Sequence, residues 1–270
     1  MGVLLMASCS KDNATDTTIL QDIDNLTASE QSAAIDLMSE DIGMIIEDAY
    51  TVDELNESND ISRTPDSLSY LPDCVTMTTV VMNGHVEKTI DFGDGCTLPN
   101  GHVLSGIIFM SYLHDTNTQT KEILASLQNF FIDGVSIEGS KSVFRERSNA
   151  NDNPQSTFTV DILVTWPNGA FASRNGQKVR EWIEGYGSGN WGDNIFLITG
   201  NRNTIFPSGA SASGDITNPL RRELACNFLV SGTVDLQRND WTGTLDFGDG
   251  ACDNLATITL VDGTVHQINL

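Results

Sequence analysis

Two identical pentapeptides, DFGDG, carry the most distinctive spacing of side chains in this sequence, at residues 91–95 and 246–250. Each holds a pair of aspartates that could bind calcium, Asp91 and Asp94 in the first copy, Asp246 and Asp249 in the second. Calcium takes about six to eight oxygen ligands, more than two carboxylates supply. We therefore expect each DFGDG to be a structural turn, with a calcium-assisted turn as the alternative and catalysis the least supported reading.

Four cysteines flank the two pentapeptides, Cys74 and Cys96 around the first, Cys226 and Cys252 around the second. Four cysteines allow three connectivities. The repeated spacing favours Cys74 with Cys96 and Cys226 with Cys252. The short CxxC spacings that are typical of zinc sites are missing, so the sequence predicts two disulfides and an oxidising compartment.

Aromatic side chains gather in the glycine-rich stretch WIEGYGSGNW, which contains Trp182, Tyr186 and Trp191. Aromatic rings on an exposed loop would suit the binding of a glycan, whereas packing in the core is the equally weighted alternative. Trp166 and Trp241 lie in alternating segments and are expected in the core.

The remaining reactive side chains select no catalytic site. The histidines are scattered and lack HxH or HExxH spacing, and carboxylates are too plentiful to single out a pair. We therefore expect a non-catalytic protein without a resident cofactor, and a secreted hydrolase is the less favoured alternative. The histidines are His85, His102, His114 and His266.

The elements that position these residues read as strands from Cys74 onward. The segment FTVDILVTW at 158–166 alternates apolar and polar residues, and Asn-Gly or Asp-Gly turns recur along the chain. This pattern predicts an antiparallel meander over residues 71–270, folded as a sandwich or a barrel-like sheet. The cysteine-flanked stretches indicate an internal duplication with repeat cores at 74–113 and 226–270.

Each repeat core has its own predicted hairpin register. In the first, a two-residue Asn-Gly turn would set Val81 opposite Val86, which places apolar residues on one face. In the second, a four-residue turn over 237–240 would set Val230 opposite Phe247. In both copies the paired cysteines then lie near each other.

One helix is expected before the strands, over residues 27–50. The residues TASE at 27–30 form a capping box, and apolar residues recur at helical spacing, so one face should pack while the other is acidic. Residues 10–26 read as a tether and residues 51–70 as a linker. Gly43 should weaken the helix by about 1 kcal/mol. The acidic residues of this helix are Asp36, Glu40, Asp41, Glu47 and Asp48.

Charge composition excludes one class of partner. The chain of 270 residues has 37 Asp and Glu against 14 Lys and Arg, a net charge of −23. Such a field repels phosphate backbones, so no nucleic-acid partner is expected. We interpret the excess acid as a solubilising surface rather than cation storage, and no apolar stretch is long enough to span a membrane.

The first residues resemble the lipobox of bacterial lipoproteins, because Leu-Met-Ala-Ser at 5–8 precedes Cys9. This resemblance implies that residues 1–9 are the remnant of a signal peptide, that Cys9 carries lipid, and that the lipid anchors the chain in a membrane. No basic region precedes the short apolar run, so we expect that the translation start lies upstream or that the sequence is trimmed. Ser-Lys-Asp at 10–12 is similar to the export tag of Bacteroidetes surface lipoproteins.

A broader resemblance, carried by TIDFGDGCTLPNGHVLSGII, VTWPNGAFASRNGQKVREWIEG and TLDFGDGACDNLATITLVDGTVHQINL, is to uncharacterised Bacteroidetes lipoproteins. Members typically show an Arg where this chain has Val103 and Leu104. DFGDG also resembles a short stretch of the PKD domain, although Ile90 and Leu245 replace its usual Trp. Together these resemblances imply an all-β protein anchored in the outer membrane and facing the exterior, with a structural or binding role and no known reaction.

Overall fold

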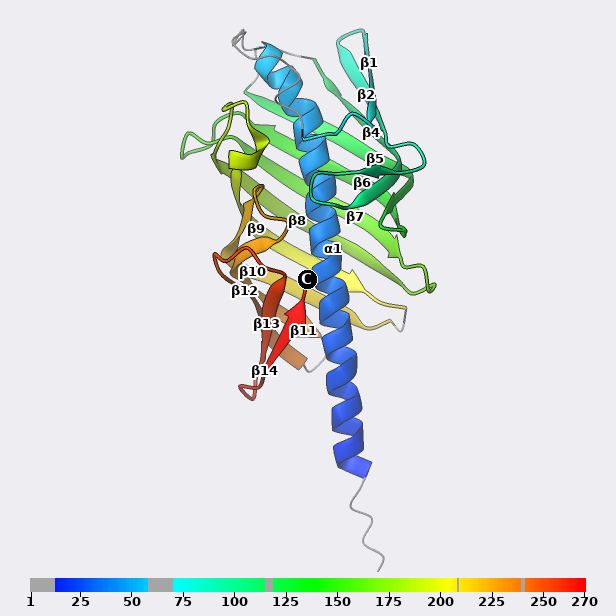
Figure 1. The fold of residues 1–270 in the computed structure, drawn as a ribbon, viewed down its shortest axis with the longest axis vertical. Helices are drawn as coiled ribbons and strands as arrows, with labels where there is room; N and C mark the ends of the chain where they lie inside the picture. Colours follow the sequence, from blue (N-terminus) through cyan, green and yellow to red (C-terminus); the bar gives the residue numbers. More distant parts are fainter. Residues whose placement is uncertain (1–12, 58–69, 115–118, 208, 239–240) are drawn as a thin grey trace, which may run out of the picture.

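The computed structural model describes residues 13–57, 70–114, 119–207, 209–238 and 241–270, with side chains of the first range described over 30–54. Lipidation of Cys9 falls outside these residues. The fold is mainly β, as predicted, with one long helix laid against one face of a large antiparallel sheet (Figure 1).

The sheet has 14 strands in meander order, so neighbours in sequence are neighbours in space, with β3 paired to β4 beside the main path. It is open, and β1 and β14 are its two ends. The elements are β1 (Thr76–Met82), β2 (His85–Asp91), β3 (Cys96–Thr97), β4 (Val103–Leu113), β5 (Thr120–Ile132), β6 (Val135–Glu146), β7 (Gln155–Thr165), β8 (Phe171–Glu184), η2 (Trp191–Asp193), β9 (Ile195–Ile205), β10 (Ser211–Glu223), β11 (Leu229–Arg238), β12 (Trp241–Asp249), β13 (Leu255–Leu260) and β14 (Val265–Asn269).

The helix is longer than the sequence predicted. Helix α1 spans Asn13–Glu57, so the expected tether at 10–26 and the start of the expected linker at 51–70 are wrong. Ile19, Ile23 and Leu26 continue the helical spacing upstream of the capping box, and helix formation propagates readily once nucleated. The first turns of α1 extend beyond the sheet (Figure 1). Among the described elements, no helix is both long and apolar enough to cross a membrane.

The middle of α1 is enclosed on every side. All residues from Met38 to Thr51 are buried, including the acidic side chains that we expected to form a separate face. That expectation is wrong because strand cations, described below, neutralise the acids inside the fold. Apolar residues of the same stretch, such as Ile42 and Ile45, are fully buried in the core with residues of β2 and β4–β8.

The two hairpins that precede the DFGDG turns differ in how well their register was predicted. In β1–β2, Val81 lies opposite Val86, as expected. In β11–β12 the prediction is wrong by two residues, because Arg238 pairs directly with Trp241 and the connection is two residues long. Val234 is consequently opposite Leu245, and both side chains are buried, so the shorter turn still keeps apolar residues on one face.

Glycines on the helix-facing side allow close approach between neighbouring strands. Gly139 in β6 and Gly200 in β9 both have φ +126, and a Cβ there would lie 2.2 Å from the Asp161 carbonyl oxygen and 2.1 Å from that of Gln177 respectively. Glycine accepts such backbone geometry without a steric penalty and commonly marks bends in strands. These positions therefore support a sheet that packs closely around α1.

Candidate functional site

Most positive charge in the described part of the chain lies between the sheet and α1. Ten Lys and Arg side chains are buried there or beside it, Arg147 and Arg221 are half-buried, and none is exposed. Buried cations are unfavourable unless they are paired. The ten are Lys88, Lys121, Lys141, Arg145, Arg174, Lys178, Arg180, Arg202, Arg222 and Arg238.

Asp36 is the centre of the first cluster of charges. Its side chain is fully buried, and its Oδ1 accepts from Arg174 Nη1 at 2.7 Å and from Lys178 Nζ at 3.2 Å. Arg202 Nη2 lies 2.9 Å from Oδ2, although its N–H is not aimed at that oxygen. Burial alone would raise the pKa of Asp36, but the three cations outweigh it and hold that pKa well below its usual range. Asp36 is therefore a carboxylate that joins β8 and β9 to the helix.

Arg180 joins the next two helix acids. Its Nη2 donates to Glu40 Oε2 at 2.8 Å, and its Nη1 donates to Glu47 Oε2 at 3.0 Å. The guanidinium passes beside Gly43, where a Cβ would lie 2.6 Å from Nη2. Burial raises the pKa of Glu40, but Lys178 and Arg180 outweigh it, so that pKa falls to about 2. Gly43 lowers helix propensity, but because it has no Cβ it leaves space for the Arg180 guanidinium that pairs with Glu40.

Glu54 and Arg145 form a third cluster near the C-terminal end of α1. Arg145 donates through Nε and Nη2 to Glu54 at 3.2 and 3.1 Å, and through Nη1 to Glu47 at 2.7 Å. Tyr186 also donates to Glu54, at 2.5 Å. Lys88 approaches Asp53, with 2.9 Å between Nζ and Oδ1. The helix is therefore bonded to β2, β6 and β8 along its length.

Lys141 is a buried cation without a carboxylate in direct contact. Its Nζ donates to the backbone oxygen and, at 3.0 Å, to the hydroxyl of Ser39. Burial lowers the pKa of Lys141 to about 7, because the nearby cations Lys178 and Arg180 reinforce the effect and Glu40 only partly opposes it. This amine consequently titrates near neutral pH.

The acid–cation pairs attach α1 to the sheet, and the described residues around them do not form a catalytic arrangement. His102 is held by two carboxylates, with Nδ1 at 2.5 Å from Asp133 and Nε2 at 3.7 Å from Asp41. Asn100 also donates to Asp41, at 3.0 Å. Burial raises the pKa of Asp41. Within the described residues no hydroxyl or thiol is hydrogen-bonded to His102, so no nucleophile and base pair is assembled there.

The DFGDG segments form the same turn in both copies. Asp91 Oδ1 accepts from Gly93 N at 2.8 Å, and Asp246 Oδ1 accepts from Gly248 N at 2.9 Å. The phenylalanine of the motif is buried in each copy, and the first glycine, Gly93 or Gly248, has a positive φ. The first aspartate of each motif therefore closes a local turn and the phenylalanine anchors it.

The second aspartates, Asp94 and Asp249, are exposed. No group of three or more His, Cys, Asp or Glu side chains in the described ranges is arranged to hold a metal ion, so the motif brings no calcium ligands together there. Both expected disulfides are present. Cys74 bonds Cys96 and Cys226 bonds Cys252, each across a Cα–Cα distance of 5.7 Å.

The aromatic residues that we considered for glycan binding do come together, but as a packed cluster. Trp182 is buried, with 3 % of its surface exposed, and its ring lies 5.0 Å from that of Tyr186 and 5.4 Å from that of Trp191. The Trp182 and Tyr186 rings stand at 78°, so they form no flat platform. The ring of Tyr70, which is itself buried, lies 6.3 Å from that of Trp191. An exposed sugar-binding surface is therefore not formed by these residues.

A hollow lies on the opposite face of the sheet. It has a volume of about 590 Å³ and runs across β2 and β4–β7, where Phe109, Leu124, Ser140 and Asp161 line it. Glu87 is the other carboxylate in its lining, and no histidine lines it. It is an open hollow in the surface of the sheet.

The comparisons with known proteins give no functional guide. No protein-family model, no curated protein and no solved structure matches this chain.

Proposed function

We propose that this chain is a lipid-anchored, exported β-rich protein whose role is structural or binding and non-catalytic. The observation that carries the proposal is the enclosure of α1. Residues 38–51 fill the trough of the sheet, where a deep substrate site would have to lie, and their acids are bonded to its cations. The accessible hollow on the outer face is open and has no histidine in its lining.

Two further features support export and anchoring. The disulfides Cys74–Cys96 and Cys226–Cys252 are typical of proteins outside the cytosol. Cys9, in its lipobox-like context, precedes the start of α1 at Asn13 by only a few residues. With lipid on Cys9, α1 would act as a stem, since residues 13–29 span roughly 25 Å at the usual rise per residue.

Metabolic labelling with a palmitate analogue tests the anchor. The full chain, expressed with a complete lipoprotein signal in front of it, should incorporate label and fractionate with membranes. The Cys9→Ala variant should lose both properties, while Cys226→Ser, a control that keeps the lipobox, should retain the label. Incorporation of label into the Cys9→Ala variant would refute the anchor.

A further inference from the structure

The two copies of the duplicated unit differ in how one strand is covered. In the second copy, β11 pairs with β12 on one side and with β10 on the other. Its equivalent in the first copy, β1, pairs with β2 alone among the described strands and forms the end of the sheet. The first copy therefore lacks the strand that β10 supplies to the second.

The free edge of β1 has none of the usual protection. All seven residues of TMTTVVM are exposed, and the strand has no charge, no proline and no bulge. Natural proteins normally block such an edge, because it can pair with any extended chain. The opposite end of the sheet, β14, is shorter, and its Ile268 is buried.

Backbone groups of alternate residues point out from this edge. Met82 and His85 flank a two-residue turn and form the hydrogen-bonded pair of the hairpin. Met77, Thr79 and Val81 consequently direct their N–H and C=O groups away from β2. In the described part of the chain these groups make no other backbone hydrogen bond.

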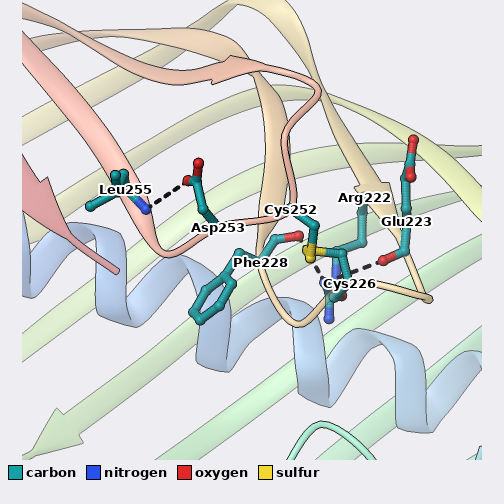
Figure 2. The surroundings of a disulfide bond; sticks show 7 residues. All are labelled: Arg222, Glu223, Cys226, Phe228, Cys252, Asp253 and Leu255. Atoms are coloured by element: carbon teal, nitrogen blue, oxygen red, sulfur yellow. Dashed lines mark hydrogen bonds between the residues drawn. A yellow bond between two sulfur atoms is a disulfide. The ribbon is translucent and has the colours of Figure 1, made fainter.

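The second copy shows what the covering strand contributes besides backbone bonds. Arg222 of β10 is buried and donates to the carbonyl oxygens of Cys226 and, at 2.9 Å, Phe228 (Figure 2). Aligning the disulfide cysteines makes Cys74 and Thr76 the equivalent residues of the first copy. No side chain of the described residues donates to their carbonyl oxygens. A cation on an incoming strand would supply the missing donor.

The surrounding charge also selects a basic partner. Asp73, Glu87 and Asp94 are exposed on or near the β1–β2 hairpin, and the described residues include no exposed Lys or Arg. A second copy of this chain would place one acidic surface against another, which is unfavourable. An extended basic segment would instead meet a surface of the opposite charge.

We propose that the free edge of β1 binds an extended, basic polypeptide segment as an added antiparallel strand. Its last residues, an arginine or lysine among them, lie beside Cys74, in the place that Arg222 takes beside Cys226. This inference deepens the binding role proposed above and is independent of the lipid anchor. Backbone bonds to Met77, Thr79 and Val81 provide affinity, and the cation fixes the register.

The test uses the oxidised full chain and two labelled peptides, acetyl-STVTVTRR-amide and its acidic match acetyl-STVTVTEE-amide. Fluorescence anisotropy should show binding of the basic peptide only. Thr79→Pro removes an outward N–H without breaking the pairing with β2, so it should weaken binding at least ~10-fold, whereas Thr79→Val, which keeps the N–H, should change it little.

Hydrogen exchange of the unsubstituted protein gives a second readout that needs no variant. The basic peptide should slow exchange at the amides of Met77, Thr79 and Val81. Absence of binding, equal binding of the acidic peptide, or an undiminished affinity in Thr79→Pro would overturn the proposal. So would a dimer in sedimentation that Thr79→Pro abolishes, because the edge would then belong to a second copy. None of these results affects palmitate labelling at Cys9, so the two proposals fail separately.

Discussion

The inner face of the sheet carries lysine and arginine among its apolar residues, whereas the outer face carries serine, threonine, asparagine and acid. The inner cations meet carboxylates of α1, and Asp36 alone contacts three of them. On the outer face, Asp161 in β7 is exposed and makes no ion pair with a described residue, while Arg221 pairs with Glu223 at 2.6 Å near the surface. Charged side chains on the inner face of the sheet therefore attach the helix, whereas those on the outer face lie at the solvated surface.

Removing an inner acid should have the largest effect. Asp36→Ala leaves Arg174 and Arg202 buried without their carboxylate and Lys178 with Glu40 alone, and loss of one partner of a buried pair costs about 3–5 kcal/mol. Urea denaturation should show a loss of that size in the free energy of unfolding. The matched outer substitution Asp161→Ala should change it by no more than about 0.5 kcal/mol. Equal effects of the two substitutions would remove the distinction between the faces.

Acid should weaken the inner face selectively. The folded pKa of Glu40 is about 2, below its ordinary value of 4.5, so its stabilising contribution is complete above pH 4.5 and is lost as pH falls toward 2. Asp36 and Glu54, whose pKa values are also lowered, act in the same direction, and Asp41, whose pKa is raised, acts in the opposite one. Urea titrations at several pH values should show stability falling over this window, less steeply in Glu40→Gln.

Lys141 should behave as an inner cation that the helix neutralises only in part. Its folded pKa is about 7 and its ordinary value is 10.5, so the unfolded chain binds more protons between these values and stability rises with pH there. Lys141→Met should therefore be more stable than the parent at pH 6 to 7, with an advantage that shrinks toward pH 10. A difference that is constant over this range would show that Lys141 keeps its ordinary pKa.

Gly43→Ala should have the smallest effect, and its sign should depend on Arg180. The substitution gains about 1 kcal/mol of helix propensity, but its Cβ would lie 2.6 Å from a guanidinium held by Glu40 and Glu47. We expect a net loss of about 1–2 kcal/mol in the parent chain. In an Arg180→Met background the same substitution should stabilise, and a double-mutant cycle measures the difference. The same sign in both backgrounds would mean that Gly43 makes no room for Arg180.

Local patterns were sufficient to predict the antiparallel meander, the disulfide pairing and the register of the first hairpin, because alternation, turns and cysteine spacing are properties of neighbouring residues. The second hairpin was shifted because its connection is two residues rather than four. The polar residues at 13–26 suggest a tether, but Ile19, Ile23 and Leu26 keep the helical spacing, and α1 extends through this segment.

The helix–sheet ion pairs were not predicted, although one signal was present. Val86, Lys88 and Ile90 alternate along β2 and so share a face, which places a cation among buried apolar residues. Lysine and arginine are ordinarily exposed, so this alternation alone would suggest an edge strand or an incorrect assignment of the buried face. The burial of such a cation depends on a carboxylate that is far away in the sequence, as Asp36 is from Arg202. No local pattern connects the two residues.

The central claim is that α1 is an integral part of the core and does not leave the sheet while the sheet stays folded. Native-state hydrogen exchange at the amides of residues 38–51, measured over increasing denaturant, tests it most directly. We predict that these amides exchange only through global unfolding, with the same free energy as the most protected amides of β6 and β8. Exchange of the helix at a markedly lower free energy than these strands would contradict the account, because α1 would then be a displaceable segment over a cationic trough.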